Sequence, residues 1–224
     1  GEIGRYGYWD SIIHDAEKSG FKAELLYASF MQSLNYSKKS ILDEAIFYTE
    51  KALTLSIETK DSIWMGYAIE HLGHLNGVLG EKSTALSYFK QAHNLYLTRK
   101  DQWRIGHVLI RIAEFHQENN ELDESMGYYR ESVEMFKNNK DTSGLTIAYN
   151  HIGRVFREKE QLDSALFYMY KSLDLRSNFE DQYYLPYTLN DLALTHFELG
   201  NLDTMFSLLE RSEKEVKRIG DNGV

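Results

Sequence analysis

The chain has 224 residues, of which 42% are hydrophobic and 13% aromatic, and it carries a formal net charge of −9. This acidic balance would repel a nucleic-acid backbone, so we expect no nucleic acid to bind through this segment. Cysteine is absent, which excludes disulfides and thiolate chemistry and slightly favours the cytoplasm, although an extracytoplasmic domain of a membrane-anchored regulator stays open. No stretch reaches the length of an apolar membrane span, so we expect no membrane contact within this segment.

The sequence repeats itself every 40 residues. One column of this period consists of aspartates, at Asp61, Asp101, Asp141, Asp181 and Asp221. A fixed period of this size is typical of a solenoid, in which each repeat buries its apolar face against its neighbours. The single proline and the long periodic polar and apolar stretches favour helices throughout. We therefore predict one all-α array.

The array begins with a lone helix. Residues 7–19 predict this helix, and we expect residues 1–20 to cap the stack by covering the apolar face of the first repeat. Residues 21–60 form a weaker first repeat. It has the second-helix sequence LDEAIFYTEKAL but carries Gln32 and Ser33 where later repeats have pairs such as Leu-Gly.

Residues 61–100 show the repeat clearly. Apolar residues at helical spacing predict a first helix, which Asp61 is placed to cap and Gly80 to end. A second helix follows, with one face formed by Ala85, Tyr88, Phe89 and Ala92. The pattern recurs at 101–140, 141–180 and 181–220, where we expect the second helices to be capped by Asp123, Asp163 and Asp203.

Two features of the last repeat depart from the pattern. Pro186 falls inside the expected first helix, so we expect it to kink that helix or delay its start. Asp221 occupies the column that opens each repeat. We therefore expect the unit 21–224 to be truncated before a further repeat or domain, with a frayed terminus and a chance aspartate as the alternative.

Two groups of residues resemble the tetratricopeptide repeat. Leu72-Gly73 stands before Ala85, Tyr88, Phe89 and Ala92, and Ile152-Gly153 stands before Ala165, Tyr168 and Ser172. The repeat is 40 residues long rather than 34 and lacks the usual proline. It is similar to the long-repeat branch found in kinesin light chain, spindle-orientation adaptors and bacterial peptide-responsive regulators. The resemblance covers residues 21–220 and implies a right-handed α-solenoid of antiparallel helix pairs.

The resemblance also implies where a ligand binds, because first helices line the concave face of tetratricopeptide arrays. The polar and aromatic residues expected in that groove are Tyr67, His71, His74, His107, Arg111, Asn150, His151, Arg154, Arg157, Tyr187 and Asn190. Arginines and a histidine form a local positive patch that could grip a carboxylate, at Arg111, His151, Arg154 and Arg157. Asn150 and Asn190 could hold a peptide backbone. The alternative is a solvated surface with intrahelical pairs such as Arg154 and Glu158.

We therefore expect a binding scaffold for a peptide or protein segment with an acidic group, serving as the sensing part of a larger regulatory protein. A self-assembly module that pairs through its convex face or stack ends, as in a homodimer, is the alternative. We expect no enzyme and no cofactor, because the chain lacks a phosphate loop and a nucleophile elbow. His71 and His74 lack the His-Glu-x-x-His spacing of a zinc site. A regulator-directed phosphatase-like activity would need an N-terminal helical bundle, for which residues 1–20 are too short.

Overall fold

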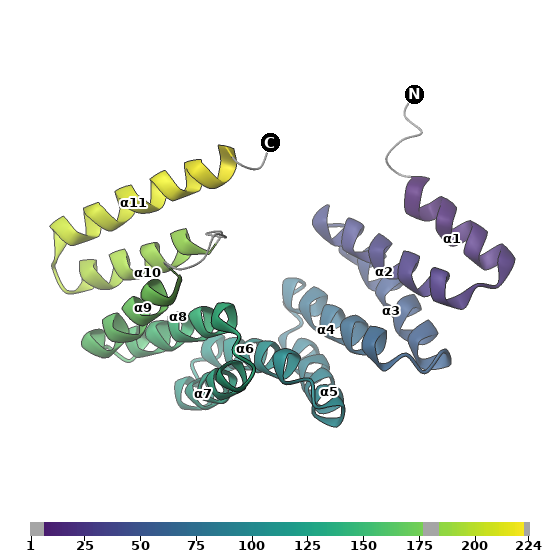
Figure 1. Ribbon diagram of the computed structural model, residues 1–224, viewed down its shortest axis with the longest axis horizontal. Coiled ribbons are helices and arrows are strands. Elements are labelled where there is room, and N and C mark those ends of the chain that lie inside the picture. Colours follow the sequence, from purple (N-terminus) through teal and green to yellow (C-terminus); the bar gives the residue numbers. More distant parts are fainter. Residues whose placement is uncertain (1–6, 177–183, 222–224) are drawn as a thin grey trace. The chain divides into compact units, whose positions relative to one another are not determined.

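The computed structural model describes residues 7–176 and 184–221, which form α-helices joined by short turns (Figure 1). These described residues contain eleven helices and no strand. The helices are α1 (Gly7–Ser19), α2 (Lys22–Lys38), α3 (Leu42–Glu58), α4 (Ser62–Val78), α5 (Lys82–Arg99), α6 (Gln102–Glu118), α7 (Leu122–Asn138), α8 (Thr142–Glu158), α9 (Leu162–Arg176), α10 (Leu185–Glu198) and α11 (Leu202–Asp221). They belong to two compact units, residues 1–101 with α1–α5 (unit 1) and residues 102–224 with α6–α11 (unit 2). The predicted all-α solenoid of antiparallel helix pairs is confirmed.

The 40-residue period contains a 20-residue half-period. Most helices from α2 onward are 17 residues long, and each helix of this length is followed by a residue with left-handed backbone. Among the described residues, the left-handed residues fall at intervals of 20 up to Glu160 and then 40 further on at Gly200: Gly20, Ser40, Lys60, Gly80, Lys100, Asn120, Lys140, Glu160 and Gly200. The turns close by backbone hydrogen bonds of the Schellman type; for example, Asp141 N–H donates to the Phe136 carbonyl at 2.9 Å.

The prediction of aspartate caps was right at Asp61 and Asp141, which precede first helices, and wrong for the aspartates expected to cap second helices. Asp61 accepts from the N–H groups of Ile63 (3.0 Å) and Trp64 (3.2 Å), and Asp141 accepts from that of Gly144 (2.9 Å).

The N-cap position of a helix is the residue that directly follows the left-handed residue of the turn, as Asp141 follows Lys140. In second helices this position is held by residues such as Glu121, which makes no side-chain capping bond. Asp123, Asp163 and Asp203 lie two residues further on, inside the first turns of α7, α9 and α11. There they act through their charge on the helix dipole.

In unit 1 the helix expected to cap the stack packs against α2. Its Ile13 and Ala16 are buried. Gln32 of α2, also buried, donates to Asp10 of α1 at 2.8 Å, and Ser33 shares a hydrogen bond of 2.5 Å with Thr49 of α3. The first repeat therefore departs from the Leu-Gly pattern because polar side chains at these positions bind the neighbouring helices.

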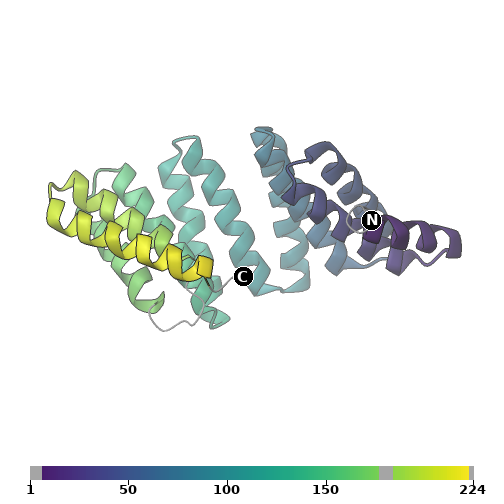
Figure 2. The same cartoon turned by 90° about the horizontal axis from the view of Figure 1, so that it is seen from above.

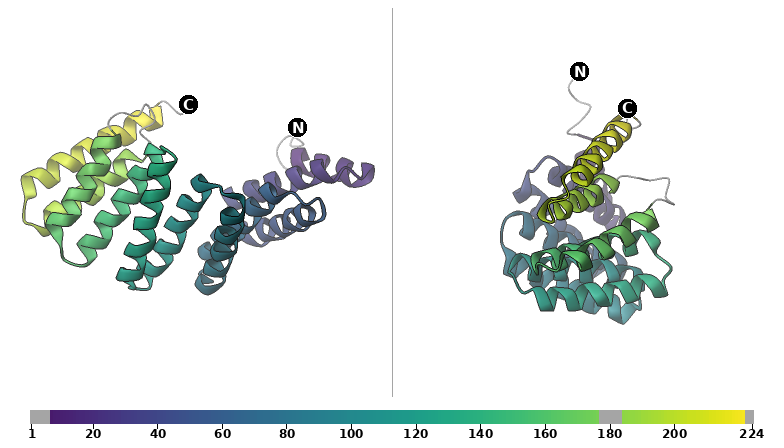
Figure 3. Two further views of the ribbon diagram at one scale, coloured as in Figure 1. Left: turned by 60° about the horizontal axis from the view of Figure 1, so that its bottom comes forward. Right: turned by 90° about the vertical axis from the view of Figure 1, so that its left-hand side faces the viewer.

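In unit 2 consecutive helices alternate in direction and pack side by side (Figures 2 and 3). The first helices also contact one another in order, α6 with α8 and α8 with α10. Small residues permit the close approach of the two helices within a repeat, as between α8 and α9. Ala165, in the predicted alanine column, is fully buried, and its carbonyl oxygen would lie 3.1 Å from a Cβ added to Gly153.

The last repeat begins late, as its proline predicted. Helix α10 starts at Leu185 with Pro186 in its first turn, where the missing N–H has no intrahelical acceptor to lose. The expected cap, Asp181, lies outside the described residues. Helix α11 continues through Asp221, and the truncation expected there stays a prediction. None of the described helices is both long enough and apolar enough to cross a membrane.

Candidate functional site: a polar cavity of unit 2

The first helices of unit 2 enclose a cavity of about 520 Å³. Helices α6, α8 and α10 contribute most of its wall, as expected for the ligand face of such an array. The lining residues are His107, Ile110, Arg111, Glu114, Ile147, Asn150, His151, Arg154, Arg176, Tyr184, Tyr187, Thr188, Asn190 and Asp191. Three arginines and two carboxylates line it, so one positive charge is in excess when the histidines are neutral.

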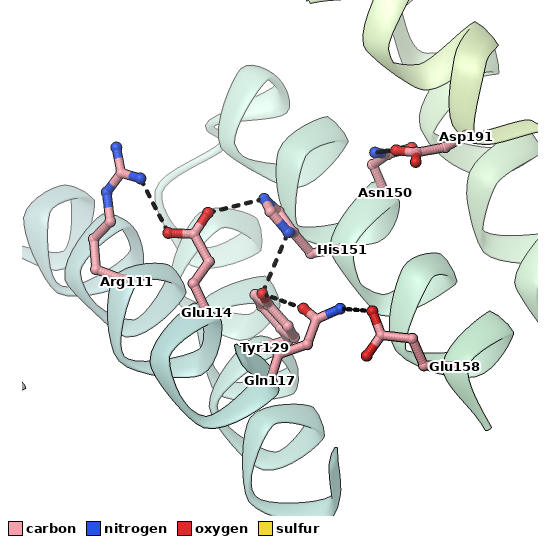
Figure 4. Close-up of polar contacts among 8 residues, drawn as sticks. All are labelled: Arg111, Glu114, Gln117, Tyr129, Asn150, His151, Glu158 and Asp191. Atoms are coloured by element: carbon pink, nitrogen blue, oxygen red, sulfur yellow. Dashed lines mark hydrogen bonds and ion pairs between the residues drawn. The ribbon is translucent and has the colours of Figure 1, made fainter. Parts of the chain in front are cut away.

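A chain of polar contacts crosses from α6 to α8 on one side of the cavity (Figure 4). Arg111 donates to Glu114 at 3.0 Å, and the other Glu114 oxygen lies 3.4 Å from His151 Nε2. His151 Nδ1 lies 3.3 Å from the Tyr129 hydroxyl. The chain continues from Tyr129 to Gln117 Oε1 (2.9 Å) and from Gln117 Nε2 to Glu158 (2.5 Å).

The His151 side chain is largely enclosed, with 14% of it exposed. Its ring stacks on Tyr129 with centroids 5.1 Å apart and an interplanar angle of 15°. Burial lowers the pKa of His151, and Arg154 and Arg111 lower it further, whereas Glu114 and Asp191 oppose this shift. Burial also raises the pKa of Tyr129, with the Glu114 carboxylate as the next contribution. Both side chains are therefore neutral at neutral pH.

A second, smaller cavity of about 170 Å³ also borders His151. Glu114, His151 and Arg154 line both cavities, and Gln117, Glu118 and Glu158 complete the smaller one. Both cavities therefore give access to the contact between His151 and Glu114.

Two polar atoms in the wall of α8 have no hydrogen-bond partner among the described residues. Asn150 donates from Nδ2 to Asp191 of α10 at 2.6 Å, which leaves its buried Oδ1 without a donor. The buried Nε of Arg154 has no acceptor. The described part of the chain also gives Arg154 no ion pair. The pair with Glu158 that the alternative interpretation would give is not formed, and Glu158 accepts from Gln117 instead. The wall thus presents an acceptor and a cationic donor one helical turn apart.

The opposite end of the cavity is aromatic. Tyr187 and Tyr184 are both about half exposed. Arg176, which is buried, places its guanidinium 5.6 Å from the centre of the Tyr184 ring and donates to Thr146 Oγ1 at 2.6 Å. His107 stands between the Trp103 and Phe136 rings, with Nε2 3.7 Å from Asp141.

Seven of the eleven residues predicted for the groove line this cavity: His107, Arg111, Asn150, His151, Arg154, Tyr187 and Asn190. Arg157 lies outside it, 3.6 Å from Asp191 and 3.7 Å from Glu198. Little of the predicted positive patch therefore keeps an unpaired charge. Arg111 pairs with Glu114, Arg157 pairs with Asp191 and Glu198, and His151 is neutral, which leaves Arg154.

The remaining three predicted residues belong to unit 1. Tyr67 and His71 pack against Phe30 at ring distances of 6.3 and 5.7 Å, and His74 is exposed beside His71. Their role in ligand binding stays a prediction. Among the residues that the structure describes, no group of three or more His, Asp or Glu is arranged to hold a metal ion.

Sequence reasoning missed Arg176 and Tyr184. They stand at the end of a second helix and at the start of α10, outside the first-helix columns from which the groove was inferred. Glu114 and Asp191 do stand in those columns, and their acidic character was the signal that the patch would be internally paired.

The fold and cavity define a tetratricopeptide-like solenoid. Residues 147–179 match the model of the tetratricopeptide repeat family, in agreement with the resemblance seen in the sequence. No curated protein matches the sequence.

Several solved structures share the fold at low identity. BtubC (BKLC) from P. vanneervenii superposes with a TM-score of 0.79 at 16% identity, covering 96% of this chain and 90% of that one. Aspartyl phosphate phosphatase F from Bacillus subtilis gives 0.76 at 16% identity, covering 99% of this chain and 59% of that one. NprR, solved in complex with its cognate peptide NprX, gives 0.72 at 16% identity, covering 94% and 61%.

Proposed function

We propose that this chain is a peptide-binding module and that the cavity of unit 2 holds a short extended peptide bearing a carboxylate. The observation that carries the proposal is the pair of unsatisfied polar atoms in the wall of α8. Among the described residues, the buried Nε of Arg154 has no acceptor and the buried Oδ1 of Asn150 has no donor. Arg154 also has no carboxylate partner there. A buried polar group without a partner is costly, so a ligand that supplies both partners gains affinity there.

The chemistry of the wall indicates how such a peptide binds. The Arg154 guanidinium offers charge-assisted hydrogen bonds to a carboxylate, and Asn150 Oδ1 accepts from a peptide N–H. Ile110, Ile147 and the exposed face of Tyr187 provide apolar surface for a neighbouring side chain. A cavity of about 520 Å³ has the size of known small-ligand sites, which corresponds to a few residues of peptide. NprR is a structural neighbour that was solved with a bound peptide.

Binding to a random library of hexapeptides, followed by fluorescence anisotropy on the selected peptides, tests this function. We expect Arg154→Met to weaken binding by tenfold or more, because one charge-assisted contact contributes about 1.5–3 kcal/mol. Arg130→Met is the matched control, since Arg130 is exposed on α7 and does not line the cavity. Equal losses in both variants, or selected peptides that ignore Arg154→Met, would contradict the assignment.

Self-assembly has one supporting observation. Helix α11 exposes a stripe of apolar side chains, Leu202, Phe206, Leu209 and Val216. Light scattering of the same samples distinguishes the two functions, because a homodimer doubles the mass and dissociates on dilution. The likeness to aspartyl phosphate phosphatase F shows the fold alone and lends no support to a phosphatase activity.

A further inference from the structure

The hydrogen-bond partners drawn in Figure 4 determine which atoms of Gln117, Tyr129 and His151 carry protons. Gln117 must turn its NH₂ group toward the Glu158 carboxylate, 2.5 Å away, since a carboxylate only accepts. Its Oε1 then faces the Tyr129 hydroxyl at 2.9 Å, so Tyr129 donates to Gln117. The hydroxyl proton is thereby used, and the contact of 3.3 Å between Tyr129 and His151 requires a proton on His151 Nδ1.

This arrangement leaves His151 Nε2 as a bare acceptor that faces a carboxylate. Glu114 lies 3.4 Å from Nε2 and is held there by Arg111. Two acceptors that face each other do not attract. A second proton on the imidazole would turn the contact into a charge-assisted hydrogen bond between His151 and Glu114.

Charged groups from three helices decide whether this second proton binds. Glu114 of α6 and Asp191 of α10 favour it, whereas Arg111 of α6 and Arg154 of α8 oppose it, and Tyr129 of α7 is neutral. Burial of the ring opposes the proton most strongly. Of the two arginines, Arg111 is already paired with Glu114, whereas Arg154 has no carboxylate among the described residues. A ligand carboxylate at Arg154 would therefore cancel the uncompensated positive charge nearest to His151.

We propose that the binding of an acidic ligand in this cavity is coupled to the uptake of one proton by His151, so that affinity rises as the pH falls. The coupling rests on the proposed function and adds to it a regulatory input, the pH. Linkage makes the effect reciprocal, because a ligand that favours the protonated imidazole binds the protonated protein more tightly.

The direction and range follow from the charges. Burial holds the free protein's His151 below the ordinary histidine pKa of about 6.5. The extra affinity is complete below the pKa of the free protein and is lost as the pH rises through the pKa of the complex. If the ligand raises this pKa by about one unit, affinity changes about tenfold across the range. Below about pH 4 the ligand carboxylate itself takes up a proton and binding weakens.

The proton assignment can be tested without any ligand. Long-range ¹H–¹⁵N NMR correlations of the free protein at neutral pH should show His151 with its proton on Nδ1. Gln117→Met removes the acceptor of the Tyr129 hydroxyl, which can then donate to Nδ1, so the proton of His151 should move to Nε2. Gln102→Met, at the exposed start of α6, should leave it on Nδ1. A proton on Nε2 in the unmodified protein would overturn the proposal.

The electrostatic part is tested by following the His151 ring signals through a pH titration. We expect Arg154→Met to raise the midpoint and Glu114→Gln to lower it, with Arg130→Met unchanged. Sodium acetate, as a minimal carboxylate, should raise the midpoint relative to sodium chloride at equal ionic strength, and this rise should vanish in Arg154→Met. An unchanged midpoint in Arg154→Met, or an acetate effect that survives it, rejects the coupling.

A selected hexapeptide completes the test. Its affinity should be several-fold higher at about pH 5 than at about pH 7.5 in the unmodified protein and nearly equal at the two values in His151→Asn. A peptide that depends on Arg154 and binds equally at both pH values overturns the coupling and leaves the proposed function intact. If neither acetate nor any peptide binds, the proposed function fails and the coupling fails with it.

Discussion

Phe136 illustrates how single residues hold the repeats together. Its ring is fully buried at the end of α7 and lies against the backbone of two other helices at glycines. A Cβ added to Gly106 of α6 would lie 2.6 Å from the ring, and one added to Gly144 of α8 would lie closer still. The Cδ1 and Cε1 atoms of this fully buried ring are among the nearest atoms to both glycines, so the ring occupies the space that either Cβ would need.

We therefore expect Gly106→Ala to destabilise unit 2. Overpacking against a fully buried ring costs about 1–3 kcal/mol, which outweighs the gain in helix propensity of about 1 kcal/mol. Gly127→Ala is the matched control, since Gly127 is exposed on α7 with nothing within 4 Å of an added Cβ. That variant should gain about 0.5–1 kcal/mol. Urea unfolding followed by circular dichroism measures both changes, and a gain in both variants would contradict the packing described for Phe136.

At the scale of the helix, the repeating unit is a turn with left-handed backbone. Only three of the nine described residues with this conformation are glycines, at Gly20, Gly80 and Gly200. The other six carry a side chain at a positive φ, which costs roughly 1 kcal/mol each. Lys140, with a φ of 56°, is one of them and connects α7 to α8.

Lys140→Gly should therefore stabilise the protein, in contrast to most substitutions by glycine. Relief of the left-handed strain exceeds the added entropy of the unfolded chain, and we expect a gain of about 0.5–1 kcal/mol. Asn139→Gly provides the comparison, because Asn139 is one residue earlier and has right-handed backbone with a φ of −91°. It should lose a similar amount. Thermal or urea unfolding that gives the two variants the same sign would refute the turn geometry.

At the scale of the whole molecule, periodicity predicted what packing requires. The 40-residue columns located the buried alanines and the first helices, because these positions must be filled in the same way in every repeat. The N-caps of the second helices were predicted two residues too late. Glutamate, as at Glu121, is not a typical N-cap residue, whereas aspartate, as at Asp123, is one. The turns at residues such as Lys140 and Glu160, which recur every 20 residues, could not be predicted either, because lysine and glutamate are not typical of a left-handed conformation.

The candidate site followed from the sequence only in part. The first-helix columns supplied seven residues of the cavity wall, but they could not show which charges cancel. Glu114 is shared between Arg111 and His151, and this pairing depends on distances across α6 and α8 that no single-helix pattern contains. Arg176 also lines the cavity, but it belongs to the second helix α9, for which the sequence pattern predicted only packing residues.

Each of the two units contains histidines whose pKa is lowered in the folded protein. In unit 1, burial lowers the pKa of His71 to about 4, and His74 adds a smaller effect of the same sign. Burial lowers the pKa of His196 in unit 2 as well, and His151 shifts in the same direction. A histidine whose folded pKa lies below its unfolded value of about 6.5 stabilises the fold fully above that value, and this contribution is lost as the pH falls.

We therefore expect the free energy of unfolding to decrease between about pH 7.5 and pH 5, and His71 to account for a large part of the loss in unit 1. Its share at about pH 5 is roughly 1–2 kcal/mol, because the folded ring resists the proton that the unfolded chain accepts. His71→Met should flatten the pH dependence and cost little at about pH 7.5, since the buried Nε2 of His71 has no hydrogen-bond partner in the described structure. Urea unfolding of both proteins at the two pH values measures the difference. An equal loss of stability on acidification in the unmodified protein and in His71→Met would show that His71 is not the group responsible.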